Sequence, residues 1–368
     1  MSYVPDEIYI EKDVADLWFT KQILSRLPQI SRTVLVEPTN RGNHIFAEPD
    51  AISAGKRILF LAKQKGSFIK PCPCTSNYIG CNYYILNLAT NCDMDCSYCI
   101  LQWYLNNPWM VIYVNLEDFK AELNKFLVRN RQKFFRIGTG ELTDSLTLEP
   151  ITEFSKLLVP LFAGLENATL ELKTKSTHIE PLLPLEHNGR TVISWSLNPP
   201  EIITREEKGT PTLTSRLEAA KLCESAGYKI GFHFDPVIHY SNWKCGYSLV
   251  VQEIFKYVNP ESIAWISLGG LRYPPQLDKT MRQRHYDSQI PFGELFLGKD
   301  GKLRYLKVVR QEMFKRIVQW IHDVDPDIFV YLCMESPEVW EYVFGRIPGG
   351  RDSLSNGLDR RCGVRTIY

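Results

Sequence analysis

Three closely spaced cysteines are the residues of this chain with the clearest chemical potential. Cys92, Cys96 and Cys99 follow the spacing Cys-x3-Cys-x2-Cys, and six of the ten cysteines lie between Cys72 and Cys99. Three thiolates on one short loop can ligate three irons of a [4Fe–4S] cluster and leave the fourth iron open to a small molecule. The alternative is a zinc site completed by one distant ligand, although structural zinc sites usually use two separated pairs of ligands. The earlier thiols, at positions 72, 74 and 81, match no metal spacing and are expected to be ordinary thiols, with a second metal site as the alternative.

The length and composition describe an ordinary globular chain. It has 368 residues, of which 44% are hydrophobic and 23% charged, and its formal net charge is +1. This balance excludes a wholly disordered or collagen-like chain. The first residues lack a signal peptide, and no apolar run reaches the roughly 18 residues that a membrane span needs. We therefore expect a cytoplasmic protein, in which a dense local group of cysteines indicates metal rather than disulfides.

The elements that must position these cysteines follow a regular alternation. From residue 83 onward, apolar strand-like runs alternate with amphipathic helical patterns. This alternation predicts an α/β fold with a parallel sheet, either curved into a barrel or, as the alternative, an open doubly wound sheet. The expected strands are 83–89, 133–138, 168–174, 191–197, 229–234 and 262–268, and the expected helices are 116–130, 151–165 and 215–227.

We expect three regions along the chain. An N-terminal α/β region, 1–82, contains strand-like segments at 33–40 and 57–64. The barrel occupies 83–270 and begins with the strand that leads into the cysteines. The C-terminal region, 271–368, contains a hairpin at 293–308, a helix at 307–324, a strand at 327–336 and a tail after Pro348 that covers the surface.

The cysteine motif resembles the signature of the radical S-adenosylmethionine superfamily, in which an aromatic residue, here Tyr98, precedes the last cysteine. The resemblance narrows to the spore photoproduct lyase family and covers most of the chain, about residues 5 to 345. The similar segments are 8–13, 65–73, 96–119, 224–247 and the hairpin around Asp300-Gly301. The resemblance implies a partial (β/α)6 TIM-like barrel, a [4Fe–4S] cluster on the three cysteines and S-adenosylmethionine bound at the open iron.

The resemblance also implies which residues contact the cofactor at the ends of the strands. Gly140 and Glu141 are similar to the Gly-Glu motif of the superfamily, so Glu141 is expected to accept from the ammonium of S-adenosylmethionine. Thr143 and Asp144 are secondary candidates, and Lys175 is expected to pair with the cofactor carboxylate. Two further residues, Ser196 and Asn198, suit the ribose hydroxyls, and Tyr98 is expected beside adenine.

For the reaction, the resemblance implies DNA repair. Members of the family return a methylene-bridged thymine dimer to two thymines. A 5′-deoxyadenosyl radical abstracts a hydrogen, the bridging C–C bond breaks, and a cysteine returns a hydrogen atom. An external electron donor such as flavodoxin or ferredoxin is implied. Two alternatives stay open: a radical reaction on another nucleic acid, nucleotide or peptide, and a non-catalytic iron–sulfur or zinc protein.

The hydrogen-returning cysteine of the family lies just after the second barrel strand. Here the corresponding stretch, 137–146, contains no cysteine, and Ile100 stands where the lyases often have tyrosine. Another thiol must then enter the site, because S–H bonds are weak and sulfur is polarizable, or the reaction ends differently, as in a non-lyase reaction. Cys333, at the end of the last strand, is the first candidate, Cys74 is the second, and Tyr98 is a poorer one.

Contact with damaged DNA has support of its own in the charge distribution. Between Leu271 and Trp320 there are eleven Lys and Arg residues against five Asp and Glu residues. A local basic region on a nearly neutral chain is typical of a polyanion site. The hairpin brings together three cations suited to phosphate contact, Lys299, Lys302 and Arg304, and one aromatic residue suited to base stacking, Tyr305.

Overall fold

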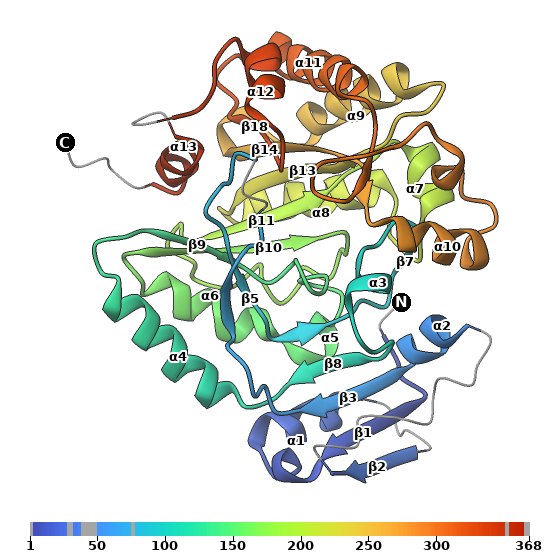
Figure 1. Cartoon of the computed structure of the whole chain (residues 1–368). Coiled ribbons are helices and arrows are strands. Elements are labelled where there is room, and N and C mark those ends of the chain that lie inside the picture. The colour runs from blue at the N-terminus through green and yellow to red at the C-terminus, as the bar shows by residue number, and fades with distance from the viewer. Residues whose placement is uncertain (1–2, 28–31, 38–49, 75–77, 350–352, 364–368) are drawn as a thin grey trace.

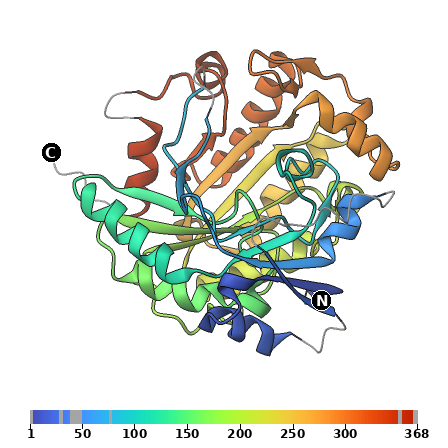
Figure 2. The same ribbon diagram turned by 60° about the horizontal axis from the view of Figure 1, so that its bottom comes forward.

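The computed structural model describes residues 3–27, 32–37, 50–74, 78–349 and 353–363. Its centre is a strongly curved sheet of eight strands, and a second sheet of five strands lies below it in Figure 1. Helices pack along the outer side of the curved sheet (Figure 2). Among the described residues, none of the helices is long and apolar enough to cross a membrane.

The curved sheet has the strand order β18-β14-β13-β11-β10-β9-β5-β4, and only β4 at one edge runs antiparallel to its neighbour. Central strands covered on both faces are apolar along most of their length, and every residue of β11 is buried. The bounds are Ile69–Pro71 for β4, Tyr84–Leu86 for β5, Phe135–Gly138 for β9, Ala168–Thr174 for β10, Thr191–Ser196 for β11, Lys229–Val237 for β13, Ile263–Gly270 for β14 and Val330–Leu332 for β18.

This open, curved sheet confirms the expected partial barrel. All six expected barrel strands are present, and β18, from the expected strand 327–336, joins them as one more parallel strand. The expected doubly wound alternative is not what forms, because the strand order runs in one direction from β5 to β18 without reversing.

The helices that connect the strands bury an apolar face against the sheet. Thr212 caps the first turn of α8, where its side chain accepts from the amide of Ser215. The expected helix 151–165 is divided in two, because Glu153 has a left-handed backbone with φ of 48°. The bounds are Leu116–Arg129 for α4, Glu149–Thr152 for α5, Phe154–Ala163 for α6, Pro200–Glu206 for α7, Leu213–Ser225 for α8 and Trp243–Tyr257 for α9.

The second sheet has the order β2-β1-β3-β8-β6 and combines the N-terminal segment with the segment that surrounds the cysteines. Its members are Glu7–Glu11 (β1), Arg32–Val36 (β2), Ile58–Ala62 (β3), Ala89–Thr90 (β6) and Met110–Tyr113 (β8), with the helices Trp18–Arg26 (α1) and Ala51–Lys56 (α2). The expected strand 33–40 is present as β2 up to Val36, and its residues 38–40 lie outside the described part of the chain. Since β6 and β8 flank the cysteine loop, this sheet supports it from below.

The C-terminal part adds a small antiparallel sheet, β15-β17-β16, and a layer of helices. Gly301 turns the hairpin with a φ of 75°, as the Asp-Gly pair predicts. The tail carries a helix whose Leu354 and Leu358 are buried, and residues 350–352 and 364–368 lie outside the described part. The bounds are Arg272–Tyr273 (β15), Phe296–Leu297 (β16), Leu303–Arg304 (β17), Pro275–Arg284 (α10), Lys307–Val324 (α11), Pro337–Phe344 (α12) and Leu354–Arg361 (α13).

Candidate functional site

A cavity of about 700 Å³ opens at the carboxyl ends of the parallel strands. Residues from the ends of β5, β10, β11 and β13 line it, together with residues that follow β9, β14 and β18. Ligands of α/β folds bind at this edge of the sheet. The volume lies within the usual range of small-molecule sites, so the cavity can hold a nucleoside-sized cofactor.

All three cysteines of the motif line this cavity. Cys96 lies in β7 (Asp95–Cys96), which pairs with β12 (Glu207–Lys208), and Cys99 precedes the short helix α3 (Leu101–Tyr104). At the start of the loop, Asn91 adopts a left-handed backbone and its amide group donates to the carbonyl of Pro108 over 2.7 Å. The loop is thereby anchored to β12 on one side and to the segment before β8 on the other.

The arrangement of the thiols bears on which group they fit. Across the described residues, no group of three His, Cys, Asp or Glu side chains is placed to hold one metal ion. A [4Fe–4S] cluster needs each thiolate on a different iron, and the three thiols that line the cavity offer that number of soft sulfur ligands.

The protonation of the thiols depends on burial and on two lysines. Burial raises the pKa of Cys96 to about 12, while the ammonium groups of Lys175 and Lys56 act in the opposite direction. Burial likewise holds the pKa of Cys92 well above its usual range, and Lys56 again opposes it. Two cations therefore favour the thiolate forms that an iron ligand requires.

The glycines at the end of β9 and just beyond it are required because neighbouring residues approach the backbone closely. A Cβ at Gly138 would lie 1.7 Å from the hydroxyl of Tyr83, and a Cβ at Gly140 would lie 2.6 Å from the carbonyl oxygen of Lys173. Glu141 lines the cavity and forms an ion pair with Lys173 on the next strand. The expected acceptor Glu141 therefore lies in the cavity wall with a cation already beside it.

Asp144, expected as a secondary cofactor residue, ties the end of β9 to the end of β10. Its carboxylate accepts from the hydroxyl of Thr174 over 2.6 Å and from the amide of Lys175 over 2.7 Å. Thr143 and Ser196 also line the cavity. The hydrogen bonds of Asp144 thus fix the part of the cavity wall that contains Lys175.

Tyr98 is fixed by a buried group of polar side chains. Its hydroxyl donates to Glu207, whose other carboxylate oxygen lies 2.7 Å from the guanidinium of Arg216. Burial alone would raise the pKa of Glu207, but Arg216 and Lys175 outweigh it and lower the pKa to about 2. Asn198 belongs to this group, since it donates to Glu207 over 2.9 Å, and it does not line the cavity. The expected ribose contact of Asn198 is therefore not supported by its position.

Several polar residues of the wall were not expected from the sequence. His233 lies between Glu171 and Ser267, at 2.7 and 2.6 Å, and Asp235 pairs with Arg272 at 2.9 Å. Of these, the wall of the cavity includes His233, Asp235 and Arg272. A signal existed for two of them, because polar His233 and Asp235 alternate with apolar residues in β13 and so share one face of the strand.

The thiols that are candidates for the hydrogen donor differ in their position relative to the cavity. Cys333 lies 3.6 Å from a guanidinium nitrogen of Arg272, and Cys74 is exposed; neither is among the cavity-lining residues. Cys72, for which no role was expected, lines the cavity. Burial raises its pKa to about 12, so its sulfur stays protonated at neutral pH.

Two of the four hairpin residues expected to contact DNA are buried. Tyr305 is 6% exposed and its hydroxyl accepts from the amide of His239, so its ring has no face left for a base. Arg304 is 3% exposed and pairs with Asp300, so it supports the turn of the hairpin rather than a phosphate. Lys299 is exposed, and Lys302 lines the cavity.

Ion pairs also engage five of the eleven cations counted between Leu271 and Trp320. The pairs are Arg272 with Asp235, Arg282 with Asp278, Arg284 with Asp50 and Asp95, Arg304 with Asp300, and Arg310 with Glu335. The charge offered to a polyanion is therefore smaller than the sequence count indicates, and it is concentrated on the lysines.

The chain is similar to known proteins in both sequence and fold. A family model described as spore photoproduct lyase matches residues 3–289. The spore photoproduct lyase of Geobacillus sp. (strain Y412MC61) is 28% identical over 214 residues, which are 57% of this chain and 63% of that protein. The Bacillus subtilis (strain 168) protein of the same name is 30% identical over 172 residues, 46% of this chain and 50% of that one. The aligned part thus spans between half and two thirds of these relatives.

Among solved structures, a mutant spore photoproduct lyase with bound AdoMet and dinucleoside spore photoproduct superposes with a TM-score of 0.80. It shares 23% sequence identity, and the match covers 90% of this chain and 100% of that chain. At this level of identity the match shows that the fold is shared.

Proposed function

Because the chain belongs to the spore photoproduct lyase family, we propose that it is a radical S-adenosylmethionine enzyme that returns methylene-bridged thymine dimers in DNA to thymines. One observation carries the proposal: the three motif cysteines line the same cavity as Glu141, Lys175 and the other strand-end residues expected to bind the cofactor. The related structure described with AdoMet and the dinucleoside lesion supports the same pairing of cofactor and substrate.

In this proposal Cys92, Cys96 and Cys99 would hold a [4Fe–4S] cluster, which would supply the electron for reductive cleavage of S-adenosylmethionine. The chain's own residues bind and orient the cofactor. Lys175 carries a charge suited to a carboxylate: burial alone would lower its pKa, but Glu207 and its other acidic neighbours together raise it. Tyr98, held by Glu207, presents a fixed ring to adenine.

The mouth of the cavity is suited to a lesion with a phosphate between its bases. Lys302 lines the wall beside Arg272, and burial together with that guanidinium lowers the pKa of Lys302. A phosphate would restore the favourable environment of this ammonium. Lys299 lies exposed on the same hairpin, where it can contact the backbone beyond the lesion.

Return of the hydrogen atom falls to a thiol outside 137–146. The S–H bond that breaks gives its hydrogen atom to the product radical. The sulfur radical that remains regains its thiol form by taking one electron from the external donor and one proton before the next turnover. Cys72 now joins Cys333 and Cys74 as a candidate, since it is a protonated thiol in the wall itself. Tyr98 is disfavoured because its hydroxyl is committed to Glu207.

The test is incubation of the reduced enzyme with S-adenosylmethionine and dinucleotide spore photoproduct, with flavodoxin or ferredoxin as the proposed physiological donor in the cytoplasm. We expect thymine release together with 5′-deoxyadenosine. Formation of 5′-deoxyadenosine without thymine release would show a radical enzyme with another substrate. A reconstituted cluster that never yields 5′-deoxyadenosine would indicate a binding role.

A further inference from the structure

The residues between the first two cysteines alternate in direction. Cys92, Met94 and Cys96 line the cavity, whereas Asp93 and Asp95 do not. Asp93 accepts a hydrogen bond from the hydroxyl of Thr147, on the far side of the loop. The carboxylate of Asp93 also lies 3.9 Å from the sulfur of Cys92. Asp95 belongs to β7 with Cys96, and neighbouring side chains of a strand point to opposite faces, so its carboxylate lies on the other side of the loop from the thiol of Cys96.

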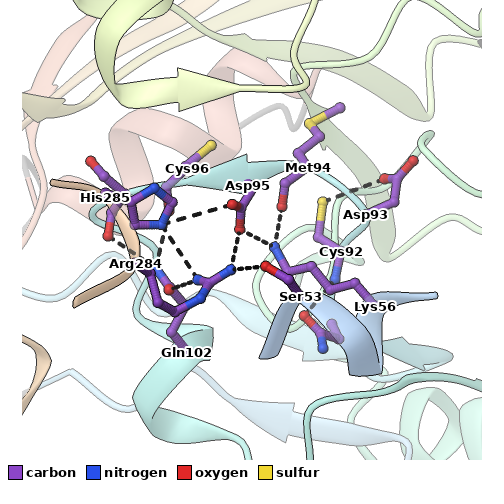
Figure 3. Close-up of polar contacts among 12 residues, drawn as sticks. Ser53, Lys56, Cys92, Asp93, Met94, Asp95, Cys96, Gln102, Arg284 and His285 are labelled. Carbon is purple, nitrogen blue, oxygen red and sulfur yellow. Dashed lines mark hydrogen bonds and ion pairs between the residues drawn. The ribbon is translucent and has the colours of Figure 1, made fainter. Parts of the chain in front are cut away.

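Asp95 is held there by two cations from distant parts of the chain (Figure 3). The ammonium of Lys56, the last residue of α2, lies 3.0 Å from one carboxylate oxygen and also donates to the carbonyl of Met94. A guanidinium nitrogen of Arg284, the last residue of α10, lies 3.0 Å from the same oxygen. Burial would raise the pKa of Asp95, but the two cations lower it to about 2.

Arg284 extends the contact beyond Asp95. Its guanidinium lies 2.8 Å from the carboxylate of Asp50, which precedes α2, and 2.8 Å from the hydroxyl of Ser53, which lies in α2. The guanidinium also donates to the side chain of Gln102 in α3. One guanidinium therefore joins α2, the cysteine loop and α3 (Figure 3). With a side chain only 7% exposed, it would be costly to bury unless all of these partners were in place.

The remaining titratable groups near Asp95 add little charge. Burial lowers the pKa of His285, whose ring nitrogen lies 3.9 Å from Asp95, so the ring is neutral at neutral pH. The side chain of Lys56 is 10% exposed and faces Asp95 first, with the thiols of Cys99 and Cys92 as its next titratable neighbours. Neither Lys56 nor Arg284 lines the cavity, so neither is placed to touch cofactor or substrate.

We propose that Lys56 and Arg284 are positioning residues, which hold the cysteine loop from behind in the conformation that directs its sulfurs into the cavity. Lys56 has a second effect in this proposal: its buried charge favours negative charge on the neighbouring sulfurs and on the group they bind. The electrostatic effect of Lys56 rests on the proposed function, whereas the positioning of the loop by Lys56 and Arg284 concerns the metal-free chain.

The experiment compares Lys56→Met, Lys56→Arg and Arg284→Gln with the wild-type protein. Lys120→Met is the matched control, because Lys120 forms an exposed ion pair with Glu117 at 2.9 Å in α4. The first measurement is hydrogen exchange of the amides of 92–97 in the metal-free protein. The second is the midpoint reduction potential of the reconstituted cluster, followed by its electron paramagnetic resonance signal.

We expect exchange of these amides to be about tenfold faster in Lys56→Met and in Arg284→Gln, since each loses charge-assisted hydrogen bonds to the cysteine loop. Lys120→Met should exchange like the wild type. The potential should be more negative in Lys56→Met, because reduction adds negative charge where a buried cation has been removed. Lys56→Arg should restore most of the wild-type value.

Wild-type exchange rates in both Lys56→Met and Arg284→Gln would overturn the positioning role. If either variant fails to fold, Asp95→Asn replaces it, because this change removes one charge at constant volume and must give the same acceleration. An unchanged potential in Lys56→Met would overturn the electrostatic role. A wild-type protein that binds no cluster would refute the proposed function, while the exchange experiment would still decide the positioning role.

Discussion

The ammonium of Lys175 lies 5.8 Å from the centre of the Tyr98 ring, so the end of β10 faces the cysteine loop across the cavity. The two residues come from different walls and share Glu207 as a charged neighbour. A cation beside an aromatic ring forms a compact recognition site for a molecule with a carboxylate at one end and a planar base at the other.

Loss of this cation should weaken binding of S-adenosylmethionine. Lys175→Met is expected to raise the dissociation constant about tenfold or more, because a charge-assisted contact with the cofactor carboxylate is lost. Equilibrium dialysis with the reconstituted protein measures it, and Lys120→Met serves as the control. Equal affinity in Lys175→Met would place the carboxylate elsewhere in the cavity.

Each motif cysteine should be necessary for the cluster. Replacing Cys92, Cys96 or Cys99 by alanine is expected to abolish the brown [4Fe–4S] chromophore and 5′-deoxyadenosine formation, because each thiolate supplies one iron ligand. Absorption spectra and iron content after anaerobic reconstitution measure the loss, with the buried Cys223→Ala as control. Full cofactor cleavage in Cys96→Ala would contradict the assignment.

The hairpin lysines should carry the salt-dependent part of DNA binding. Lys299→Ala with Lys302→Ala is expected to weaken binding and to reduce the slope of log K against log salt by about 1 to 2, since each phosphate contact releases condensed counterion. Arg304→Ala should instead lower the stability of the hairpin, because Arg304 pairs with Asp300. A salt slope equal to that of the wild type would mean that DNA binds elsewhere.

The hydrogen-returning thiol can be identified by product analysis. Cys72→Ala, Cys74→Ala and Cys333→Ala are compared on dinucleotide spore photoproduct for thymine yield and for trapped adducts. We expect the position of Cys72 in the wall to make its loss the most damaging, with cofactor cleavage intact. Unchanged thymine in all three variants would exclude these thiols as the donor.

The buried pair of Glu207 and Arg216 should make the free energy of unfolding fall as the pH becomes acidic. Glu207 has a pKa of about 2 in the folded chain against a value of 4.5 for an ordinary glutamate. A carboxylate whose pKa is lowered by folding stabilises the fold above its unfolded pKa, and this contribution is lost as pH falls from about 4.5 towards 2.

Urea unfolding of wild type and Glu207→Gln at several pH values measures this contribution. At pH 7 we expect the variant to be less stable by about 3 kcal/mol or more, since Arg216 is left as a buried charge without its partner. The difference should shrink as pH falls towards 2. A difference that stays constant with pH would show that the Glu207 carboxylate does not titrate on unfolding.

The fold was predictable where one local pattern decides the structure. The strand 168–174 and the helix 307–324 have the bounds expected from the sequence, because continuous burial and amphipathic spacing are strong signals. The division of 151–165 was not predictable in this way. The carbonyls of Ile151 and Thr152 accept from Arg26, 125 and 126 residues away, and this contact replaces the helical continuation.

The site divides in the same manner. The cysteine spacing and the polar strand ends are local, and the structure places most of those residues on one cavity. Contacts between Lys56, Asp95 and Arg284 span 39 and 189 residues and leave no local signal. The roles expected for Arg304 and Tyr305 were wrong because a sequence does not tell which side of a short hairpin packs inward.

The wall after β9 also bears on how this site can change over evolution. Gly138 and Gly140 cannot accept a side chain, because a neighbouring residue occupies the place of the Cβ. Leu142 and Thr143, two and three residues beyond Gly140, already send side chains into the cavity. A single replacement at one of these open positions could therefore place a thiol on this wall. The position of the hydrogen-donating thiol can thus change while the barrel and the cysteine loop stay as they are.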